Sequence, residues 1–455
     1  MNAPPAFKNL LWLIYKRTGV LHALLIRLQL IRLHGLRQGN LSFRKLPPGD
    51  LHPLDRLISS DQATLLGRSN VLGSVFKFKT RRQLIIAISD LRTARRLISE
   101  HGESLQTHHK DLDAIFPIGH LRGMRGATHR HYRQLFVRAI RPELIDACTH
   151  DLRDILRHEL AALSPPSSTA RLSTDRLIVG MREMTTKMLL RILFGLRTVD
   201  AMTQPMLDAF ANFSDGYAPA RDFYPKQHVF ASIRDLVTQQ IDVLFNTPSP
   251  IRVQCVLGSL SSQETLDDTT LGNLIYMVEA GRFDVFSLFR WIVYYLAHAP
   301  NMTAKVDRER SEHGGSDDLH FAKAVVLETL RLNQSEAIQR QLSRDLWFDH
   351  FFFPAGSQIR FCLWEAHKRD DPFECPMHFH PDRFVQHDYS IDQYAPFGLD
   401  QHRCIAADIV VMMATLFVDE LARHEIKIGN DDNITFGAYH WEPGQAFSIE
   451  FGPRR

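Results

Sequence analysis

The chain has 455 residues, of which 44% are hydrophobic and 23% charged, and its formal net charge is +3. This length and balance predict a globular protein with a sizeable core, and so small a net charge gives no indication of nucleic-acid binding. The five cysteines are scattered and odd in number, which argues against a disulfide framework and favours a reducing, cytoplasmic environment.

The first segment, residues 7–34, is rich in Leu and Ile but repeatedly interrupted by Lys and Arg. No uncharged run reaches the roughly 18 residues of a membrane span, and no signal-peptide cleavage pattern follows. The pattern predicts a basic amphipathic helix, or two such helices joined near Gly19, which either lies on an anionic membrane surface or packs on the protein itself. Because Pro47 and Pro48 break the chain, we expect a boundary at residue 45 and a single domain over 46–455.

Two short strands are predicted next. Residues 75–79 alternate between apolar and basic, and residues 84–88 are wholly apolar. Asp90 is expected to cap a helix that carries Ala94 and Leu97 on one face.

His129 and Arg133 lie four residues apart in a basic helix and therefore share a face. They are either part of a solvated basic surface or a pair that binds an anionic group. Residues 173–246 are expected to be helical throughout.

A long, buried helix is predicted over residues 271–298, which contain no proline and are apolar almost all round. Its middle contains Ala280, Gly281 and Asp284. A glycine there costs about 1 kcal/mol relative to alanine, which indicates that something approaches the backbone closely.

Cys404 lies between a polar loop, which begins with Phe397 and Gly398, and an apolar run over 409–416. Next to His402 and Arg403, and before an expected helix, its thiol is expected to have a lowered pKa. Such a thiolate could be a nucleophile, a zinc ligand or the axial ligand of a haem iron. The alternative is an inert structural cysteine.

A zinc site is the main rival interpretation, because Cys375-x-x-His378 has a plausible ligand spacing. Pro376 and Pro381 crowd this stretch, however, and no second ligand pair supports it. The full candidate set would be Cys375, His378, His380 and Cys404.

The run Phe397-Gly398…His402-x-Cys404 resembles the haem-binding loop of the cytochrome P450 family. Three other segments occur in that family's order: the His129/Arg133 helix, the helix over 271–298, and Glu328 and Arg331 followed by the proline-rich stretch 371–384. The resemblance covers residues 46–455. It implies a mainly α-helical protein with small β-sheets, in which a long central helix lies over a buried haem b.

The resemblance also implies roles for individual residues. Cys404 would be the axial ligand of the haem iron, and Ala280 and Gly281 would line the substrate pocket. The cofactor-binding residues would be His129, Arg133, Arg340 and His402, which hold the propionates, with Phe397 and Cys404. A buried ion triad that fixes the cysteine loop would comprise Glu328, Arg331 and Arg383.

The sequence departs from the family where Asp400 and Ala406 stand in place of glycine. We expect Asp400 to tighten the loop and to place a charge near the thiolate. In the long helix the usual acid–alcohol pair is replaced by Phe283 and Asp284. We therefore expect Asp284 to be the distal acid–base group, or to hold a polar group of the substrate, unless it pairs with Arg282 or another basic residue.

The implied function is haem-thiolate monooxygenation of an apolar small molecule, with dioxygen and electrons from an acidic ferredoxin or flavodoxin. The alternatives are a peroxide-driven or oxygen-independent enzyme with the same cofactor, and a non-catalytic haem protein. We expect a cytoplasmic monomer, with any membrane contact confined to residues 7–34. The partner is expected to dock on basic residues near the cysteine side of the haem: Arg130, Arg138, Arg141, Lys368, Arg369 and Arg403.

Overall fold

The computed structural model describes most of the chain after residue 45, and the segment 7–34 lies outside the described residues. The described ranges are 46–50, 62–80, 83–107, 119–163, 170–172, 174–213, 227–261, 266–312, 319–334, 337–436, 441–444 and 446–453. Within these ranges, no helix combines the length and hydrophobicity that crossing a membrane requires.

The chain divides into two compact units that alternate along the sequence. The first comprises Met1–His108, Glu336–Pro376 and Ser390–Gln401, and the second comprises His109–Ser335, Met377–Tyr389 and His402–Arg455. The predicted single domain over 46–455 stays a prediction, and each unit is described by itself.

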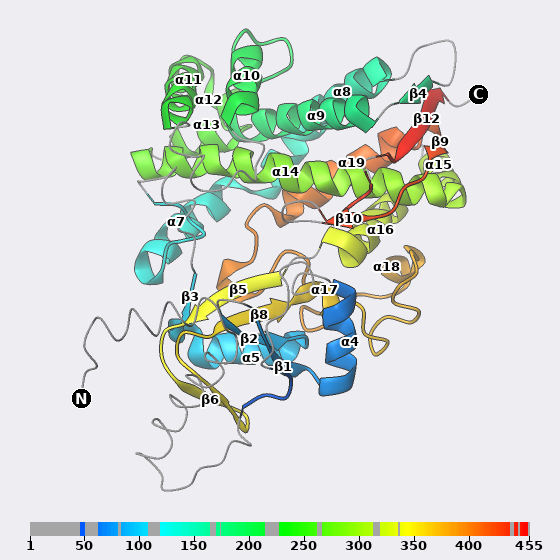
Figure 1. Ribbon diagram of the computed structural model, residues 1–455. Coiled ribbons are helices and arrows are strands. Elements are labelled where there is room, and N and C mark those ends of the chain that lie inside the picture. The colour runs from blue at the N-terminus through cyan, green and yellow to red at the C-terminus, as the bar shows by residue number, and fades with distance from the viewer. Residues whose placement is uncertain are drawn as a thin grey trace, which may run out of the picture. The chain divides into compact units, whose positions relative to one another are not determined.

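The first unit is built on a five-stranded sheet of order β1-β2-β8-β5-β3 (Figure 1). Strand β2 pairs antiparallel with β1 and parallel with β8, which in turn pairs antiparallel with β5. The strands are β1 (Val75–Lys79), β2 (Leu84–Ile88), β3 (Leu105–Gln106), β5 (Ala337–Leu342) and β8 (Gln358–Cys362), with a separate hairpin of β6 (Leu346–Phe348) and β7 (Phe351–Phe353). The helices are α4 (Gln62–Leu72), α5 (Leu91–His101) and α17 (Leu363–Ala366), with a 3-10 turn over Gly102–Ser104.

Strand β2 is apolar at every position because both faces of the sheet are covered. Ile86 and Ile88 belong to the core cluster that includes Leu91 of α5, whereas Ile85 belongs to the cluster of Leu65 in α4. Helix α5 begins where expected, since the Asp90 carboxylate accepts the Thr93 N–H at 2.8 Å. Both predicted strands and the predicted cap are confirmed.

The second unit is helical, with small sheets near the C-terminus (Figure 1). Its helices are α7 (Gly126–Ala139), α8 (Pro142–Leu163), α9 (Thr174–Phe194), α10 (Thr203–Phe213), α11 (Gln227–Phe245), α12 (Ser249–Arg252), α13 (Val256–Ser261), α14 (Asp268–His298), α15 (Pro300–Glu312), α16 (His320–Thr329), α18 (Asp382–Gln386) and α19 (Ala407–Leu421), with a π-helical turn over Leu330–Gln334. Its strands are β4 (Ala170–Leu172), β9 (His424–Asn430), β10 (Thr435–Phe436), β11 (Trp441–Glu442) and β12 (Ser448–Pro453), in the sheets β4-β12-β9 and β10-β11.

Helix α14 is the long helix that the sequence predicts, and it packs along α9 (Figure 1). It begins three residues earlier than expected, because Asp267 caps it by accepting the Thr270 N–H at 2.7 Å. On another side the ring of Phe289 stacks on Phe417 of α19, with centroids 4.0 Å apart. The helix that follows Cys404 is therefore packed directly against α14.

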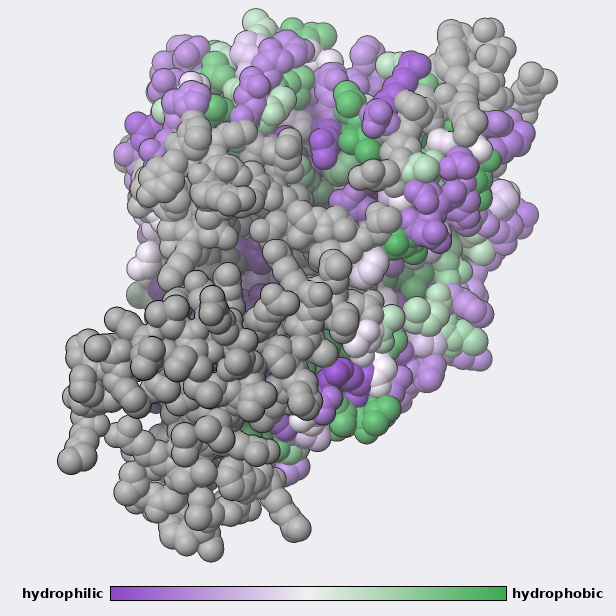
Figure 2. All heavy atoms as spheres, viewed as in Figure 1, coloured by the Kyte–Doolittle hydropathy of each residue, from purple (hydrophilic) through white to green (hydrophobic). Residues whose placement is uncertain are grey.

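The prediction of unbroken helix over 173–246 is wrong between α9 and α10. Gly195 adopts a φ of +74°, which ends α9, and turns occupy the residues up to Thr203. On the outer surface above α10 and α11, Figure 2 shows mostly hydrophilic side chains with scattered apolar ones. Val243 and Phe245 of α11 are exposed apolar side chains.

Candidate active site

The loop before Cys404 contains two residues in the left-handed backbone region. Gly398 has a φ of +90° and Asp400 a φ of +49°. Asp is among the few residues other than glycine that tolerate this conformation, which explains why it can stand there. Ala406, by contrast, has a φ of −96°, so that position needs no glycine. Phe397 is half-buried within the first unit.

The charge of Asp400 is paired inside the first unit. Its Oδ1 accepts from Arg95 Nε at 3.3 Å, and Arg95 Nη1 donates to Asp392 Oδ1 at 2.7 Å. These two carboxylates raise the pKa of the Arg95 guanidinium through hydrogen bonds. The Asp400 carboxylate is therefore not a free charge near the thiolate. Its salt bridge with Arg95 holds the loop against α5.

Cys404 lies three residues before α19, in the second unit. Solvent reaches the side chain, yet burial by the surrounding protein raises the pKa of its thiol. The N–H of Ala406, which donates to the sulfur, and the guanidinium groups of Arg133 and Arg403 act in the opposite direction, whereas Asp284 adds to the increase. The predicted lowering of this pKa is wrong, because desolvation outweighs the positive field.

Helix α7 brings His129 and Arg133 next to the residues beside Cys404. The His129 ring lies 4.5 Å from the His402 ring between centroids, and Arg133 Nη1 donates to the carbonyl oxygen of Arg403 at 2.8 Å. Burial, and then the charges of Arg133 and Arg130, lower the pKa of His129. A lowered pKa favours the neutral imidazole, which has one N–H to donate.

Arg340 is the predicted propionate ligand that belongs to the other unit. It lies on β5 opposite Ile359, is half-buried, and donates to the Gln339 carbonyl at 2.8 Å. Its role as a cofactor ligand stays a prediction, as does that of Phe397.

The residues in the middle of α14 have different surroundings. Asp284 is exposed, and its charge acts on both Cys404 and Tyr276. Arg282 is buried and bonded to Glu279 at 2.8 Å. A Cβ on Gly281 would lie 3.2 Å from Leu189 Cδ1 of α9, so the close approach inferred from this glycine is by a packed side chain.

Sequence reasoning missed a group near Asp284. Tyr276 lies eight residues earlier on α14, and the Arg122 side chain hydrogen-bonds its phenol. The His120 ring packs edge-to-face on it, with centroids 5.4 Å apart. Helical spacing could have identified Tyr276, whereas nothing in the sequence connects it to Arg122.

Glu328, Arg331 and Arg383 are brought together as a buried triad. Arg331 donates to Glu328 through Nε at 2.7 Å and Nη2 at 2.8 Å, and Arg383 Nε lies 3.2 Å from Glu328 Oε1. The His380 N–H also donates to Oε1, at 2.9 Å. These charges are paired and hydrogen-bonded, as buried charges must be.

The basic residues predicted to receive a partner divide into two groups. Arg130, Arg138, Arg141 and Arg403 are exposed in the second unit. Arg369 and Lys368 belong to the first unit, where Arg369 is half-buried and its Nη1 lies 3.5 Å from Asp90 Oδ1. Lys368 is buried, with Nζ 4.4 Å from the centroid of the Trp364 ring, so its inclusion in that surface is wrong.

The cysteines give no support to the zinc interpretation. All five are free: Cys375 and Cys404 are exposed, and the other three are buried. Burial raises the pKa of Cys148 and of Cys255 to about 11, and also raises that of Cys362. In the described part of the chain, no three His, Cys, Asp or Glu side chains gather as a metal site would require.

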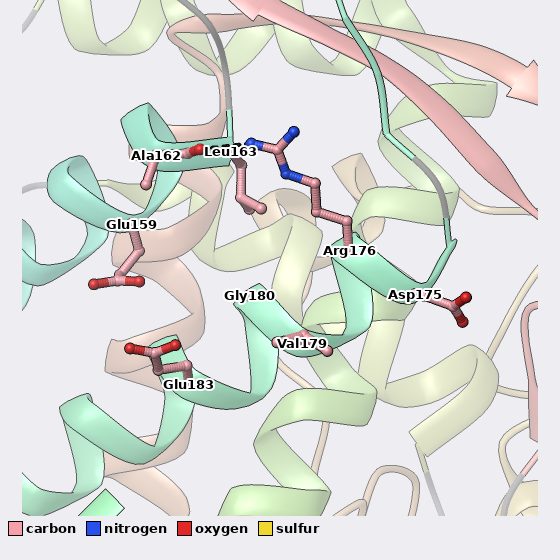
Figure 3. A pocket seen from close by; sticks show the side chains of 8 residues that line it. All are labelled: Glu159, Ala162, Leu163, Asp175, Arg176, Val179, Gly180 and Glu183. Carbon is pink, nitrogen blue, oxygen red and sulfur yellow. Dashed lines mark hydrogen bonds between the residues drawn. The ribbon is translucent and has the colours of Figure 1, made fainter. Parts of the chain in front are cut away.

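A cavity of about 500 Å³ lies between α8 and α9, away from the predicted site residues (Figure 3). The carboxylates of Glu159 and Glu183 lie close together at one side of it, because Lys187 Nζ is 2.7 Å from both. The single ammonium group of Lys187 thus balances one of the two negative charges at that side.

Comparison with known proteins supports one family. The model described as "Cytochrome P450" matches residues 254–430. A putative cytochrome P450 139 of Mycobacterium tuberculosis is 29% identical over 209 residues, which are 42% of this chain and 48% of that protein. Abscisic acid 8'-hydroxylase 1 of Arabidopsis thaliana is 25% identical over 201 residues, 40% of this chain and 43% of that protein. The chain thus spans less than half the length of these curated relatives.

The structure of a retinoic acid-bound cyanobacterial CYP120A1 superposes with a TM-score of 0.72 at 18% identity. The superposition covers 90% of this chain and 100% of the CYP120A1 chain. This likeness confirms the predicted fold.

Proposed function

Because the chain belongs to the cytochrome P450 family, we propose that it is a haem-thiolate monooxygenase that acts on an apolar small molecule. Membership implies a haem held by a cysteine thiolate. The observation that carries the proposal is the surroundings of Cys404, whose accessible sulfur receives the Ala406 N–H and lies within the field of Arg133 and Arg403. These groups fit a thiolate on iron, and coordination deprotonates a thiol whose pKa is otherwise raised.

The chemistry that haem supplies when bound is one-electron and dioxygen chemistry at iron. Overall, one oxygen atom enters a C–H bond of the substrate, and the other becomes water with two electrons and two protons. Within the chain, the cations beside Cys404 stabilise its negative charge. His129, Arg133, Arg340 and His402 are proposed to hold the propionates by hydrogen bonds and charge, and Phe397 to contact the cofactor.

Asp284 is proposed to move protons toward the oxygen being reduced. It is exposed on α14, and its charge reaches Cys404. Arg282, one of the basic residues that could instead pair with Asp284, is hydrogen-bonded to Glu279 at 2.8 Å. Ala280, one turn before Asp284, is proposed to line the substrate pocket, and so is Gly281 where it is not covered by Leu189.

The peroxide-driven alternative rests on the same helix. Phe283 is buried where the family usually has an acid, so the usual relay of acid and alcohol is missing. If Asp284 does not deliver protons, either a substrate hydroxyl or an ordered water supplies them, or the oxidant is a peroxide, which carries its own protons.

Electrons are proposed to come from an acidic ferredoxin or flavodoxin that docks on Arg130, Arg138, Arg141 and Arg403. Residues 7–34 are proposed to contact an anionic membrane surface. Removal of residues 1–45 is then expected to leave haem binding intact and to weaken association with anionic vesicles.

The test of the function compares wild-type protein with Cys404→His. We expect the reduced, carbon monoxide-bound spectrum of the wild type to show a thiolate-type band, and that of the variant a histidine-type band. Identical histidine-type bands would show that Cys404 is not the ligand. Turnover of a bound substrate with dioxygen and reducing equivalents would then indicate a monooxygenase, and turnover with peroxide alone would indicate the peroxide-driven enzyme.

A further inference from the structure

The segment from Gly119 to Met124 is fixed on the first half of α14. Asn273 Oδ1 accepts the Leu121 N–H at 2.6 Å, and its Nδ2 donates to the Gly119 carbonyl at 3.4 Å. The segment also closes on itself, because the N–H groups of Gly123 and Met124 donate to the His120 carbonyl at 3.0 and 3.1 Å. The side chains of this turn are therefore held at a defined place on the helix.

Three hydrogen-bonding side chains meet at this place. Tyr276 of α14 is half-buried, Arg122 is exposed, and His120 is buried. Arg122 hydrogen-bonds the phenol, while the imidazole of His120 packs edge-to-face on its ring. A guanidinium and a phenol, held together and reached by solvent, match the acceptor geometry of a carboxylate.

The same place belongs to the surroundings of Cys404. Tyr276, Ala280 and Asp284 follow each other at intervals of four residues and share a face of α14. The charges of Asp284 and Cys404 both act on the Tyr276 phenol. With a rise of 1.5 Å per residue, Tyr276 and Asp284 are about 12 Å apart along the helix axis.

We propose that Arg122 and Tyr276 bind the carboxylate of an otherwise apolar substrate. This rests on the proposed monooxygenase function and names its substrate class. Arg122 can present two parallel N–H donors to a carboxylate while Tyr276 donates its O–H. Asp284 repels a second negative charge, so the acid group binds at the Tyr276 end and the apolar part extends toward Asp284. Oxidation is therefore directed to a carbon remote from the carboxylate.

Binding of acids and their esters tests this directly. Dodecanoic, hexadecanoic and abietic acids, each with its methyl ester, are titrated into the holoenzyme, and calorimetry and the haem absorption change are recorded. We expect at least one acid to bind about tenfold more tightly than its ester. Arg122→Gln should abolish this preference, Arg122→Lys should restore part of it, and Tyr276→Phe should reduce it. Arg125→Gln, in which an exposed arginine three residues away loses the same charge, should leave it unchanged.

The proposal is wrong if no acid binds, if esters bind as tightly as acids, or if Arg122→Gln and Arg125→Gln behave alike. Calorimetry does not depend on iron. The affinities of the acids and esters can therefore be measured even if the carbon monoxide spectrum lacks a thiolate-type band. A thiolate-type band without any preference for acids would overturn only the substrate class. Acid binding without that band would overturn the function and leave the binding site.

Discussion

At the scale of single residues, Asp284 decides how protons reach the reaction. If it delivers them, Asp284→Asn should slow turnover driven by dioxygen and electrons by about 10²-fold or more, while turnover driven by peroxide persists. If it instead holds a polar group of the substrate, both routes should slow and the ligand-induced absorption change should weaken. Equal turnover of variant and wild type by both routes would remove Asp284 from the mechanism. The measurements are initial rates with each oxidant and a substrate titration.

Substitutions at Asp400 test whether the left-handed backbone at this position determines which residues the loop accepts. In the left-handed conformation, alanine costs about 1–2 kcal/mol, whereas glycine costs little. We therefore expect Asp400→Ala, which also loses the bond to Arg95, to lower the free energy of unfolding by about 1–2 kcal/mol. Asp400→Gly should stay within about 1 kcal/mol of the wild type, since a half-exposed salt bridge contributes little.

The control for Asp400 is its neighbour Gln401, which is exposed and does not belong to the described residues with a positive φ. There, alanine should be no worse than glycine in urea unfolding. If alanine and glycine were equivalent at 400, backbone conformation would not explain the choice of residue at that position.

At the scale of elements, the Glu328 triad joins the end of α16 to the segment around α18. Arg331→Met leaves Glu328 with less than its full set of donors in a site without solvent, because both side chains are 0% exposed. We expect a loss of about 3–5 kcal/mol in the free energy of unfolding. The matched control is Lys305→Met, since Lys305 also reaches α18, through Asp382 at 2.8 Å, but at 41% exposure. That change should cost no more than about 1 kcal/mol, and a similar loss for both would contradict the buried role.

The elements show what sequence alone could predict. Strands β1 and β2, the Asp90 cap and the length of α14 follow from local patterns of apolar, capping and breaking residues. The end of α9 does not, because apolar spacing continues past Gly195 and no proline marks the turn. The glycine of α14 was correctly taken as a point of close approach, but only the fold identifies Leu189 as the neighbour.

The site follows the same rule. Cys404 and the His129/Arg133 pair stand in local patterns, whereas Arg383, 55 residues from Glu328, was assigned to the triad only through the family resemblance. The pKa of Cys404 was mispredicted, because the helix and the cations are local in sequence whereas desolvation is produced by the whole fold. Arg122 and Tyr276 are 154 residues apart, so only the packing of their segments brings them together.

At the scale of the whole molecule, a net charge of +3 is too small to attract a partner without local concentration of charge. We expect the rate of electron transfer from an acidic ferredoxin to fall as ionic strength rises, because steering between exposed charges is screened. Arg130→Glu should lower the rate at low salt and flatten its dependence on salt. Lys323→Glu, the same change of charge on α16, should do neither, and rates indifferent to salt and to Arg130 would exclude this docking surface. Stopped-flow reduction of the haem is the measurement.

Because the five cysteines differ in exposure, the number of reactive thiols should depend on how much haem the protein carries. If Cys404 binds the iron as proposed, Cys375 is left as the accessible thiol, while burial keeps Cys148, Cys255 and Cys362 protonated and covered. A chromogenic disulfide reagent should therefore release one equivalent of dye per haem-loaded chain and two per haem-free chain, the second slowly because the pKa of Cys404 is raised. Unfolding should release all five. Intermediate values would measure fractional loading in a preparation without recourse to any absorption of the haem itself.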